Sequence, residues 1–322
     1  MNPDFKDYLL KVTESSACEE IEVIQSLWSG YGKVSRYQLF DSPLSTVVVK
    51  FISLNQSNEH PRGWNTDHSH SRKVKSYKVE THWYEKWNHL CTDKCSVPKF
   101  IGSFSAGKEQ WIILEDLNVN FPLRKQQIDL AEVKVCLKWL ANFHATFLNH
   151  KPIGLWQVGT YWHLKTRADE FEKIQNQELK AKAHLIDELL NQCNYQTIVH
   201  GDAKLANFCF SENGSKIAAV DFQYVGGACG MKDVAYFFGS CLSSSECELN
   251  EKELLDYYFS ELESALEDAI VTINFKELEQ EWRRLYPVAC ADFTRFLLGW
   301  MPTHQKINNY NLNLMHSVLS SL

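Results

Sequence analysis

Residues 198–210 read IVHGDAKLANFCF and place three polar side chains between two apolar runs. Asp202 follows a His-Gly pair, and Lys204 and Asn207 come soon after it. A buried strand has no use for these groups, because buried polar side chains cost free energy unless they find partners. A loop that holds a metal ion and a reacting hydroxyl uses all of them. The stretch therefore predicts a functional loop.

The segment that follows predicts a β-hairpin. Two apolar runs, FCF and KIAAV, flank the turn SENGS, and the second run leads to Asp221 in VDFQ. Because a hairpin brings its two ends side by side, Asn207 and Asp221 are expected to lie close together. An amide oxygen and a carboxylate suit a hard cation, Mg²⁺ above all. The alternative is that Asp202 and Asn207 are turn residues and that Asp221 caps an element.

This combination of side chains suits phosphoryl transfer. Positioning and neutralisation of charge on the phosphoryl oxygens lower the barrier of that reaction, and a carboxylate orients the attacking hydroxyl. In the protein-kinase template, a loop Asp, an Asn and a later metal-binding Asp share these tasks. Asp202, Asn207 and Asp221 match the template, with Asp202 placed to accept a proton.

The elements predicted before this loop are mainly strands. Residues 33–52 and 100–117 predict two hairpins, and the polar stretch 53–71 predicts a loop. Residues 72–90 predict one embedded helix, since apolar side chains recur on one face at Val79, Trp83 and Trp87.

The order of elements predicts an α+β, two-lobed, protein-kinase-like fold. Residues 1–117 form a small β-rich, nucleotide-binding lobe. Residues 118–322 form a larger, mainly helical lobe with the catalytic loop, the metal site and the acceptor pocket. The cleft between the lobes is the expected place for a site. Capping boxes are predicted at two helix starts, Asp129 with Glu132 and Asn250 with Glu253.

A lysine inside an apolar strand indicates a nucleotide-binding site. Lys50 ends the run VVVK, and a buried ammonium needs a partner or an anion. Glu80 on the following helix is the expected partner, with Glu85 as the second choice, and the pair would direct Lys50 towards the α- and β-phosphates. The alternative is a lysine on an edge strand whose ammonium reaches solvent.

Two further stretches are assigned to nucleotide binding. Gly30 and Gly32 in SGYGK are predicted to cover the phosphates, although two glycines before a hairpin are also common without a ligand. The backbone near Glu115 and Leu117, in WIILEDL, is predicted to meet the adenine edge at the hinge. An ordinary strand between lobes would have the same sequence.

At these residues the chain resembles the superfamily of small-molecule kinases that includes aminoglycoside phosphotransferases, choline and ethanolamine kinases and, most of all, the ecdysteroid kinase-like group. VHGDAKLANFCF resembles its catalytic loop, VDFQ its metal motif and LEDL its hinge. SYKVETHWYEKW resembles a helix of the ecdysteroid kinase-like group. The resemblance implies a two-lobed, protein-kinase-like fold and transfer of the γ-phosphate of ATP to the hydroxyl of a small molecule.

The resemblance also implies roles for individual residues. It makes Asp202 the catalytic base, Asn207 and Asp221 the Mg²⁺ ligands, and Lys50 the phosphate-binding lysine with Glu80 as its partner.

Three residues near the loop have two interpretations each. Lys204 is assigned to contact the γ-phosphate, as the lysine at that spacing does in protein kinases, and the alternative is a solvated lysine. His200 is expected to be structural rather than a proton carrier. Asp233 resembles an acidic residue that anchors the catalytic loop, and the alternative is a helix N-cap.

The acceptor is not specified by the sequence. Aromatic residues of the helical lobe could hold a quaternary ammonium, a sterol or a nucleobase, and the alternative is that they are core residues: Trp156, Tyr161, Trp162, Trp282, Tyr286, Trp300 and Tyr310. Choline-like, sterol-like and other small alcohols therefore stay open. A second function class is a nucleotide-binding pseudokinase that acts through a protein partner, but such a module has no need of the base.

Composition limits the partners. The net charge of −7 argues against a nucleic acid or a membrane surface as partner. No apolar run reaches the roughly 18 residues of a membrane span, and the start MNPDFKDYLL lacks the features of a signal peptide. The ten scattered cysteines are expected to be free thiols in the cytoplasm. His89, Cys91 and Cys95 lack the second pair that a zinc site needs.

Overall fold

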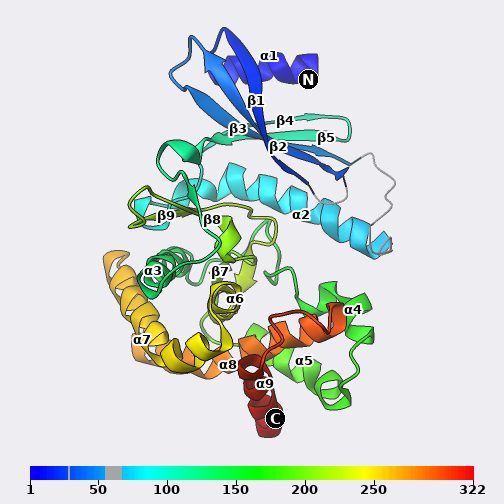
Figure 1. Cartoon of the computed structure of the whole chain (residues 1–322), viewed down its shortest axis with the longest axis vertical. Coiled ribbons are helices and arrows are strands. Elements are labelled where there is room, and N and C mark those ends of the chain that lie inside the picture. Colours follow the sequence, from blue (N-terminus) through cyan, green and yellow to red (C-terminus); the bar gives the residue numbers. More distant parts are fainter. Residues whose placement is uncertain (28–29, 55–66) are drawn as a thin grey trace. The chain divides into compact units, whose positions relative to one another are not determined.

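The N-terminal part of the chain is built on one antiparallel sheet. The computed structural model describes residues 1–27, 30–54 and 67–322 (Figure 1). Strands follow the order β1-β2-β3-β5-β4 across the sheet, with bounds β1 Ala17–Ser26, β2 Gly32–Phe40, β3 Thr46–Ser53, β4 Phe100–Ala106 and β5 Glu109–Glu115. Both predicted hairpins are confirmed, as β2 with β3 and β4 with β5.

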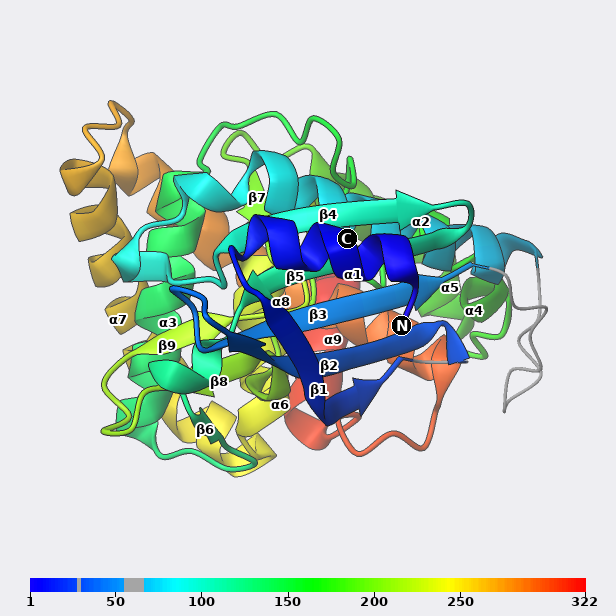
Figure 2. The same cartoon turned by 90° about the horizontal axis from the view of Figure 1, so that it is seen from above.

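Helix α1 (Pro3–Val12) covers one face of this sheet, as Figure 2 shows. It begins where the Asn2 side chain accepts a hydrogen bond from Phe5 N and Pro3 takes the first helical position. The buried side chains of Phe5 and Leu9 pack against alternate residues of three strands, Tyr37, Leu39, Val47, Val49, Trp111 and Ile113. The sequence prediction of a single helix in this region was therefore wrong.

Helix α2 (Asp67–Lys86) lies on the other face of the sheet (Figures 1 and 2). It begins earlier than the predicted helix at 72–90, so the last part of the predicted loop is helical, and residues 55–66 of that loop lie outside the described residues. The helix ends sooner, followed by a 3₁₀ turn at Asn88–Leu90, because the buried Asn88 side chain bonds the backbone of Pro98 and Phe100. The predicted apolar face is confirmed, since Val79, Trp83 and Trp87 are all buried.

We expect Gly32→Ala to destabilise the sheet by about 1–3 kcal/mol. Gly32 has φ +146°, and a Cβ there would lie 2.0 Å from Phe51 O on the neighbouring strand. Gly107→Ala is a matched control, because its φ is also positive (+61°) but a Cβ would meet nothing within 4 Å. Urea denaturation of both variants measures the difference. Equal losses of stability would show that the close approach of β3 does not matter.

The rest of the chain is mainly helical, which confirms the α+β prediction. Its helices are α3 Leu130–Thr146, α4 Ala168–Glu172, α5 Gln177–Asn191, α6 Met231–Cys241, α7 Ser244–Asp268, α8 Phe275–Trp300 and α9 Asn309–Ser321. Short strands form two small sheets, β6-β8-β9 and β10-β7, with bounds β6 Leu123–Arg124, β7 Thr197–Val199, β8 Phe208–Phe210, β9 Ile217–Ala219 and β10 Gly226–Ala228.

The contacts divide the chain into two compact units. The first comprises Met1–Leu90 and Val97–Pro122, and the second comprises Cys91–Ser96 and Leu123–Leu322. The short segment Cys91–Ser96 thus belongs with the helical unit although both its neighbours in sequence belong to the sheet. Ser96 O accepts hydrogen bonds from Trp139 Nε1 at 2.9 Å and from Ala219 N at 3.1 Å.

One of the two predicted capping boxes is confirmed. Asp129 and Glu132 bond each other's backbone at the start of α3. The prediction for Asn250 was wrong, since α7 is capped by Ser243 with Glu246, which have the same spacing earlier in the chain. Asn250 lies inside the helix, where its Nδ2 donates to Glu246 O at 2.9 Å.

Among the described residues, no helix is long and apolar enough to cross a membrane. All ten cysteines are unpaired. In the same part of the chain no group of three or more His, Cys, Asp or Glu side chains is arranged to hold a metal ion.

Candidate active site

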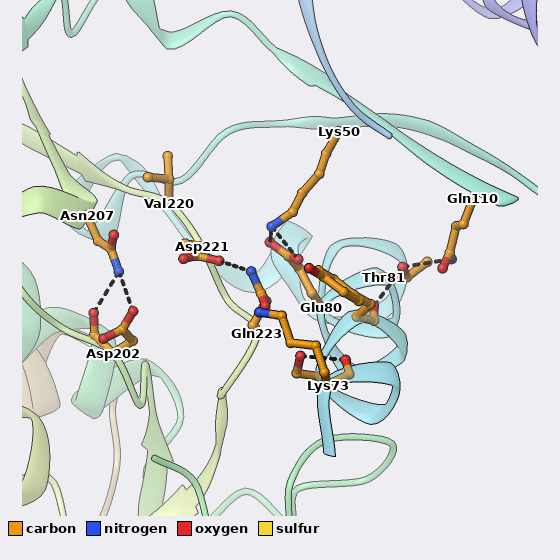
Figure 3. Close-up of polar contacts among 12 residues, drawn as sticks. Lys50, Lys73, Glu80, Thr81, Gln110, Asp202, Asn207, Val220, Asp221 and Gln223 are labelled. Carbon is orange, nitrogen blue, oxygen red and sulfur yellow. Dashed lines mark hydrogen bonds and ion pairs between the residues drawn. The ribbon is translucent and has the colours of Figure 1, made fainter. Parts of the chain in front are cut away.

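The loop after β7 gathers polar groups around one carboxylate, Asp202, and Figure 3 shows one of them, Asn207. Asp202 Oδ2 accepts hydrogen bonds from Lys204 Nζ and from Asn207 Nδ2, both at 3.0 Å. Asp202 Oδ1 accepts one from Tyr236 OH at 3.0 Å. Asp202 is only 7% exposed. Three predicted residues therefore meet at one carboxylate, whose direction is fixed by donors on both oxygens.

A second buried carboxylate holds the loop in place. Asp233 accepts hydrogen bonds from His200 N at 2.6 Å and Gly201 N at 2.9 Å, and it contacts His144 Nε2 at 3.2 Å. The N-cap of α6 is Gly230, so the N-cap interpretation of Asp233 was wrong and the anchoring interpretation is confirmed. The anchor is rigid because Asp233 is fully buried in the first turn of a helix.

His200 joins the loop to the hairpin. Its Nδ1 accepts a hydrogen bond from Asp202 N at 3.2 Å, so Nε2 carries the proton and donates to Val220 O at 3.0 Å. The ring is fully buried. These contacts agree with the predicted structural role of His200. Gly201 is required between the two residues, because its φ is +79° and a Cβ would lie 2.1 Å from Tyr224 O.

The β8–β9 hairpin brings Asn207 and Asp221 to the same end (Figure 3). Val220 N donates to Asn207 O at 3.0 Å, and Asp221 follows directly. Asp221 has φ +69°, in the left-handed region that few non-glycine residues adopt. Its Oδ1 accepts a hydrogen bond from Gln223 Nε2 at 2.6 Å.

The donor set at this end of the hairpin fits a hard divalent cation. Asn207 uses its Nδ2 group on Asp202 Oδ2 and on Asp202 O, at 3.0 and 2.8 Å, which leaves its amide oxygen as the end that could ligate a metal. Asp221 adds carboxylate oxygens, and oxygen ligands are those that Mg²⁺ prefers.

The N-terminal unit contains a buried ion pair. Lys50 Nζ lies 2.8 Å from Glu80 Oε1 and 2.7 Å from Glu80 Oε2, and the two residues are 6% and 1% exposed (Figure 3). Lys50 is on β3, the middle strand of the sheet, so the alternative of a solvent-reaching lysine on an edge strand was wrong. Glu85, the second-choice partner, instead accepts a hydrogen bond from Ser103 Oγ at 2.6 Å.

The other residues assigned to the nucleotide lie in the same unit. Glu115 ends β5, where its N donates to Lys99 O at 2.9 Å, and Leu117 begins a 3₁₀ turn at Leu117–Val119. Gly30 has φ +69° and follows two residues outside the described part of the chain, whereas Gly32 is the first residue of β2. Their contact with a nucleotide stays a prediction.

Asp116, between the two hinge residues, has a structural role. It caps the turn by accepting from Asn118 N, and it accepts further hydrogen bonds from Arg36 Nε at 2.6 Å and Thr46 Oγ1 at 2.8 Å. Burial raises the pKa of the Asp116 carboxyl, but these three donors more than offset it, so the pKa lies below its ordinary value.

The sequence interpretation missed Tyr236. Its hydroxyl contacts Asp202, and its ring belongs to an aromatic cluster that comprises Tyr161, Trp162, Tyr236, Phe293, Phe296 and Trp300. The sequence did contain a signal for Tyr236. Asp233 and Tyr236 are three positions apart, so they share the face of α6 that contacts the loop. The cluster is itself part of the buried core. Three of the seven aromatic residues considered for the acceptor are buried outside it: Trp282, which bonds Tyr195 O, and Tyr286 and Tyr310, which bond each other.

Known proteins share this fold. An ethanolamine kinase from Plasmodium vivax matches with a TM-score of 0.53 at 12% identity, over 96% of this chain and 85% of its own. An aminoglycoside-3′-phosphotransferase of type VIII matches with a TM-score of 0.47 at 14% identity, over 89% of this chain and 98% of its own. The first of these shows that the chain has the fold of a small-molecule kinase.

The match to a protein family covers a smaller part of the chain than the matches to solved structures do. The ecdysteroid kinase-like family model matches residues 157–270, which include the loop, the hairpin and α6. The predicted resemblance to the small-molecule kinases, and to the ecdysteroid kinase-like group in particular, is confirmed. No curated protein matches the chain by sequence.

Proposed function

We propose that the protein is an ATP-dependent phosphotransferase that moves the γ-phosphate to a hydroxyl of a small molecule. The observation that carries the proposal is the arrangement of Asp202, which is directed by Lys204, Asn207 and Tyr236 and lies beside the hairpin end that presents Asp221. In the proposed reaction the acceptor hydroxyl gives its proton to Asp202 while its oxygen bonds to the γ-phosphorus and ADP leaves.

Asn207 and Asp221 would hold Mg²⁺, which when bound neutralises charge on the phosphate oxygens. Lys204 would contact the transferred phosphoryl group. Burial lowers the pKa of the Lys204 ammonium, but the ion pair with Asp202 raises it more, so the pKa lies above its ordinary value and the side chain is charged at neutral pH. A fixed cation beside the base suits a group on which negative charge develops.

In the N-terminal unit, Lys50 would bind the α- and β-phosphates while Glu80 holds its ammonium. A buried ion pair of this kind restricts the lysine to one direction, which a phosphate-binding cation needs. The backbone at Glu115 and Leu117 would meet the adenine edge. Gly30 and Gly32 would let the chain cover the phosphates closely.

We expect Asp221→Asn to remove the Mg²⁺ dependence of ATP binding. The variant keeps the size of the side chain but loses the charge that attracts the cation. Calorimetric titration with ATP, with and without Mg²⁺, should give wild type about tenfold tighter binding with the metal and the variant no difference. Asp268→Asn is a matched control, since Asp268 is exposed and pairs with Lys94 instead.

Two outcomes would contradict the proposal. If Asp221→Asn keeps the full Mg²⁺ dependence, the hairpin end is not the metal site. If wild type binds neither ATP nor GTP under any condition, the protein is not a kinase. The alternative of a nucleotide-binding pseudokinase is then excluded as well.

A further inference from the structure

Two cysteines meet in the short segment that follows α2. Cys95 ends a 3₁₀ turn at Asp93–Cys95, where its N donates to Thr92 O at 3.1 Å, and Cys91 lies just before this turn. The turn folds the chain back, so that the Cys91 thiol donates a hydrogen bond to the sulfur of Cys95. Both cysteines are unpaired. The fold therefore holds two thiols in contact without a covalent link.

Hydrogen-bond donors surround the Cys95 sulfur. Donors stabilise a thiolate more than they stabilise a thiol. The hydrogen bond from Cys91 lowers the pKa of Cys95, burial raises it, and further hydrogen bonds from Thr92 lower it again, so that the pKa is about 7. At neutral pH a large share of the molecules therefore carry a thiolate here, and the thiolate is the form of cysteine that attacks an oxidant.

Cys91 gives this charge access to solvent. Cys95 is fully buried, with its Sγ 3.8 Å from Thr146 Oγ1, whereas Cys91 is partly exposed. Burial and the charge of Cys95 raise the pKa of Cys91 itself. The two sulfurs share one proton once the pair has lost the other, and transfer of that proton to Cys95 leaves the thiolate on the exposed side. The reactivity thus belongs to the pair rather than to either cysteine alone.

A second pair of cysteines shows that contact between two thiols is not sufficient. Cys193 and Cys229 are hydrogen-bonded to each other, but they are 9% and 0% exposed. Burial raises the pKa of Cys229 well above its ordinary value, and Cys193 raises it further. The Cys229 thiol therefore keeps its proton at neutral pH, and this pair serves as an internal comparison.

We propose that Cys91 and Cys95 form a reversible oxidation site, at which a hydroperoxide converts the two thiols to a disulfide. One sulfur attacks the peroxide, so a sulfur–oxygen bond forms while the oxygen–oxygen bond breaks and an alcohol or water leaves. The second sulfur then attacks the first, so the disulfide forms while the oxygen leaves as water. The thiols lose two electrons and two protons in total, and the peroxide takes them up. This inference does not rest on the proposed kinase function.

Peptide mapping tests the proposal directly. Reduced full-length protein is treated at neutral pH with hydrogen peroxide, alkylated, and digested with trypsin in the absence of a reductant. Trypsin cuts after Lys86, Lys94 and Lys99, so Cys91 and Cys95 fall in the separate peptides 87–94 and 95–99. A disulfide joins these peptides, and dithiothreitol separates them again. We expect the joined peptide to form at least about tenfold faster than any product that joins Cys193 to Cys229.

The pH dependence assigns the reaction to the folded pair. The rate of joining should rise with pH and reach half its maximum near pH 7, because the thiolate is the reacting form. In urea the half-maximum should move up towards the value of an ordinary thiol, about 8.5, because the turn that supplies the donors is lost. Cys91→Ser should abolish the joined peptide. Cys241→Ser, at another partly exposed thiol, is the control and should leave the rate unchanged.

Three results would overturn the inference. The joined peptide forms no faster than the Cys193–Cys229 product, or Cys91 is oxidised without becoming joined to Cys95, or the half-maximum lies at the same pH in the folded protein and in urea. Each readout is the mass of a peptide. Failure of the kinase proposal is therefore a separate result, since the oxidation is measured without ATP.

Discussion

Asp202→Asn is expected to lower kcat for phosphoryl transfer by about 10²- to 10⁴-fold. The amide has nearly the shape of the carboxylate but cannot take the proton of the acceptor hydroxyl. Binding of Mg²⁺-ATP should change little, since the assigned metal ligands and Lys50 are untouched. Turnover is measured as ADP release in the presence of the best alcohol of a screen, and nucleotide binding is measured by calorimetry on the same samples.

A second variant, Tyr236→Phe, tests how much one hydrogen bond to Asp202 contributes to turnover. It removes one hydrogen bond to Asp202 Oδ1 but leaves the carboxylate and its two other donors. Its loss of kcat should therefore be smaller than that of Asp202→Asn. Turnover at the wild-type rate in Asp202→Asn, with folding intact, would rule out Asp202 as the base.

Asp233→Ala is expected to cost about 3–5 kcal/mol in the free energy of unfolding. The substitution leaves the N–H groups of His200 and Gly201 buried without their acceptor, and His144 loses its contact. Unsatisfied buried donors are among the costliest defects that a single mutation creates. Urea denaturation measures the loss.

The control for that experiment is Asp256→Ala. Asp256 pairs with Lys252 and Arg283 at a half-exposed position of α7, and surface pairs contribute about 1 kcal/mol or less. A loss of stability in Asp233→Ala no larger than that of this control would show that the loop does not depend on its anchor. Unchanged Mg²⁺-ATP binding by Asp233→Ala would give the same answer for the loop itself.

Local spacing made the centre of the candidate site predictable. The turn SENGS between two apolar runs was enough to place Asn207 beside the start of the metal motif, and the hairpin has that register. The pairing of Lys50 with Glu80 also followed from a simple rule, because an ammonium in an apolar strand needs a counter-ion. Both inferences used properties of the residues themselves and needed no knowledge of the packing.

Other features could not be found in this way. Lys306 and Tyr236 meet only because the segment after α8 returns to α6, and no local pattern records that contact. The start of α7 was misplaced because Ser243 with Glu246 and Asn250 with Glu253 have the same capping spacing, and only the packing of the helix distinguishes them. Apolar periodicity specifies the buried face of a helix better than it specifies the helix ends.

The assignment of Cys91–Ser96 to the helical unit has a consequence for synthesis on the ribosome. The sheet unit is complete once Pro122 has emerged, but at that time Cys91–Ser96 has none of its own unit to pack against. The buried thiol of Cys95 must wait for Thr146 to be translated, and the carbonyl of Ser96 must wait for Trp139 and Ala219. A gene fragment that begins at Leu123 would, for the same reason, encode a helical unit with two hydrogen-bond donors lacking their acceptor.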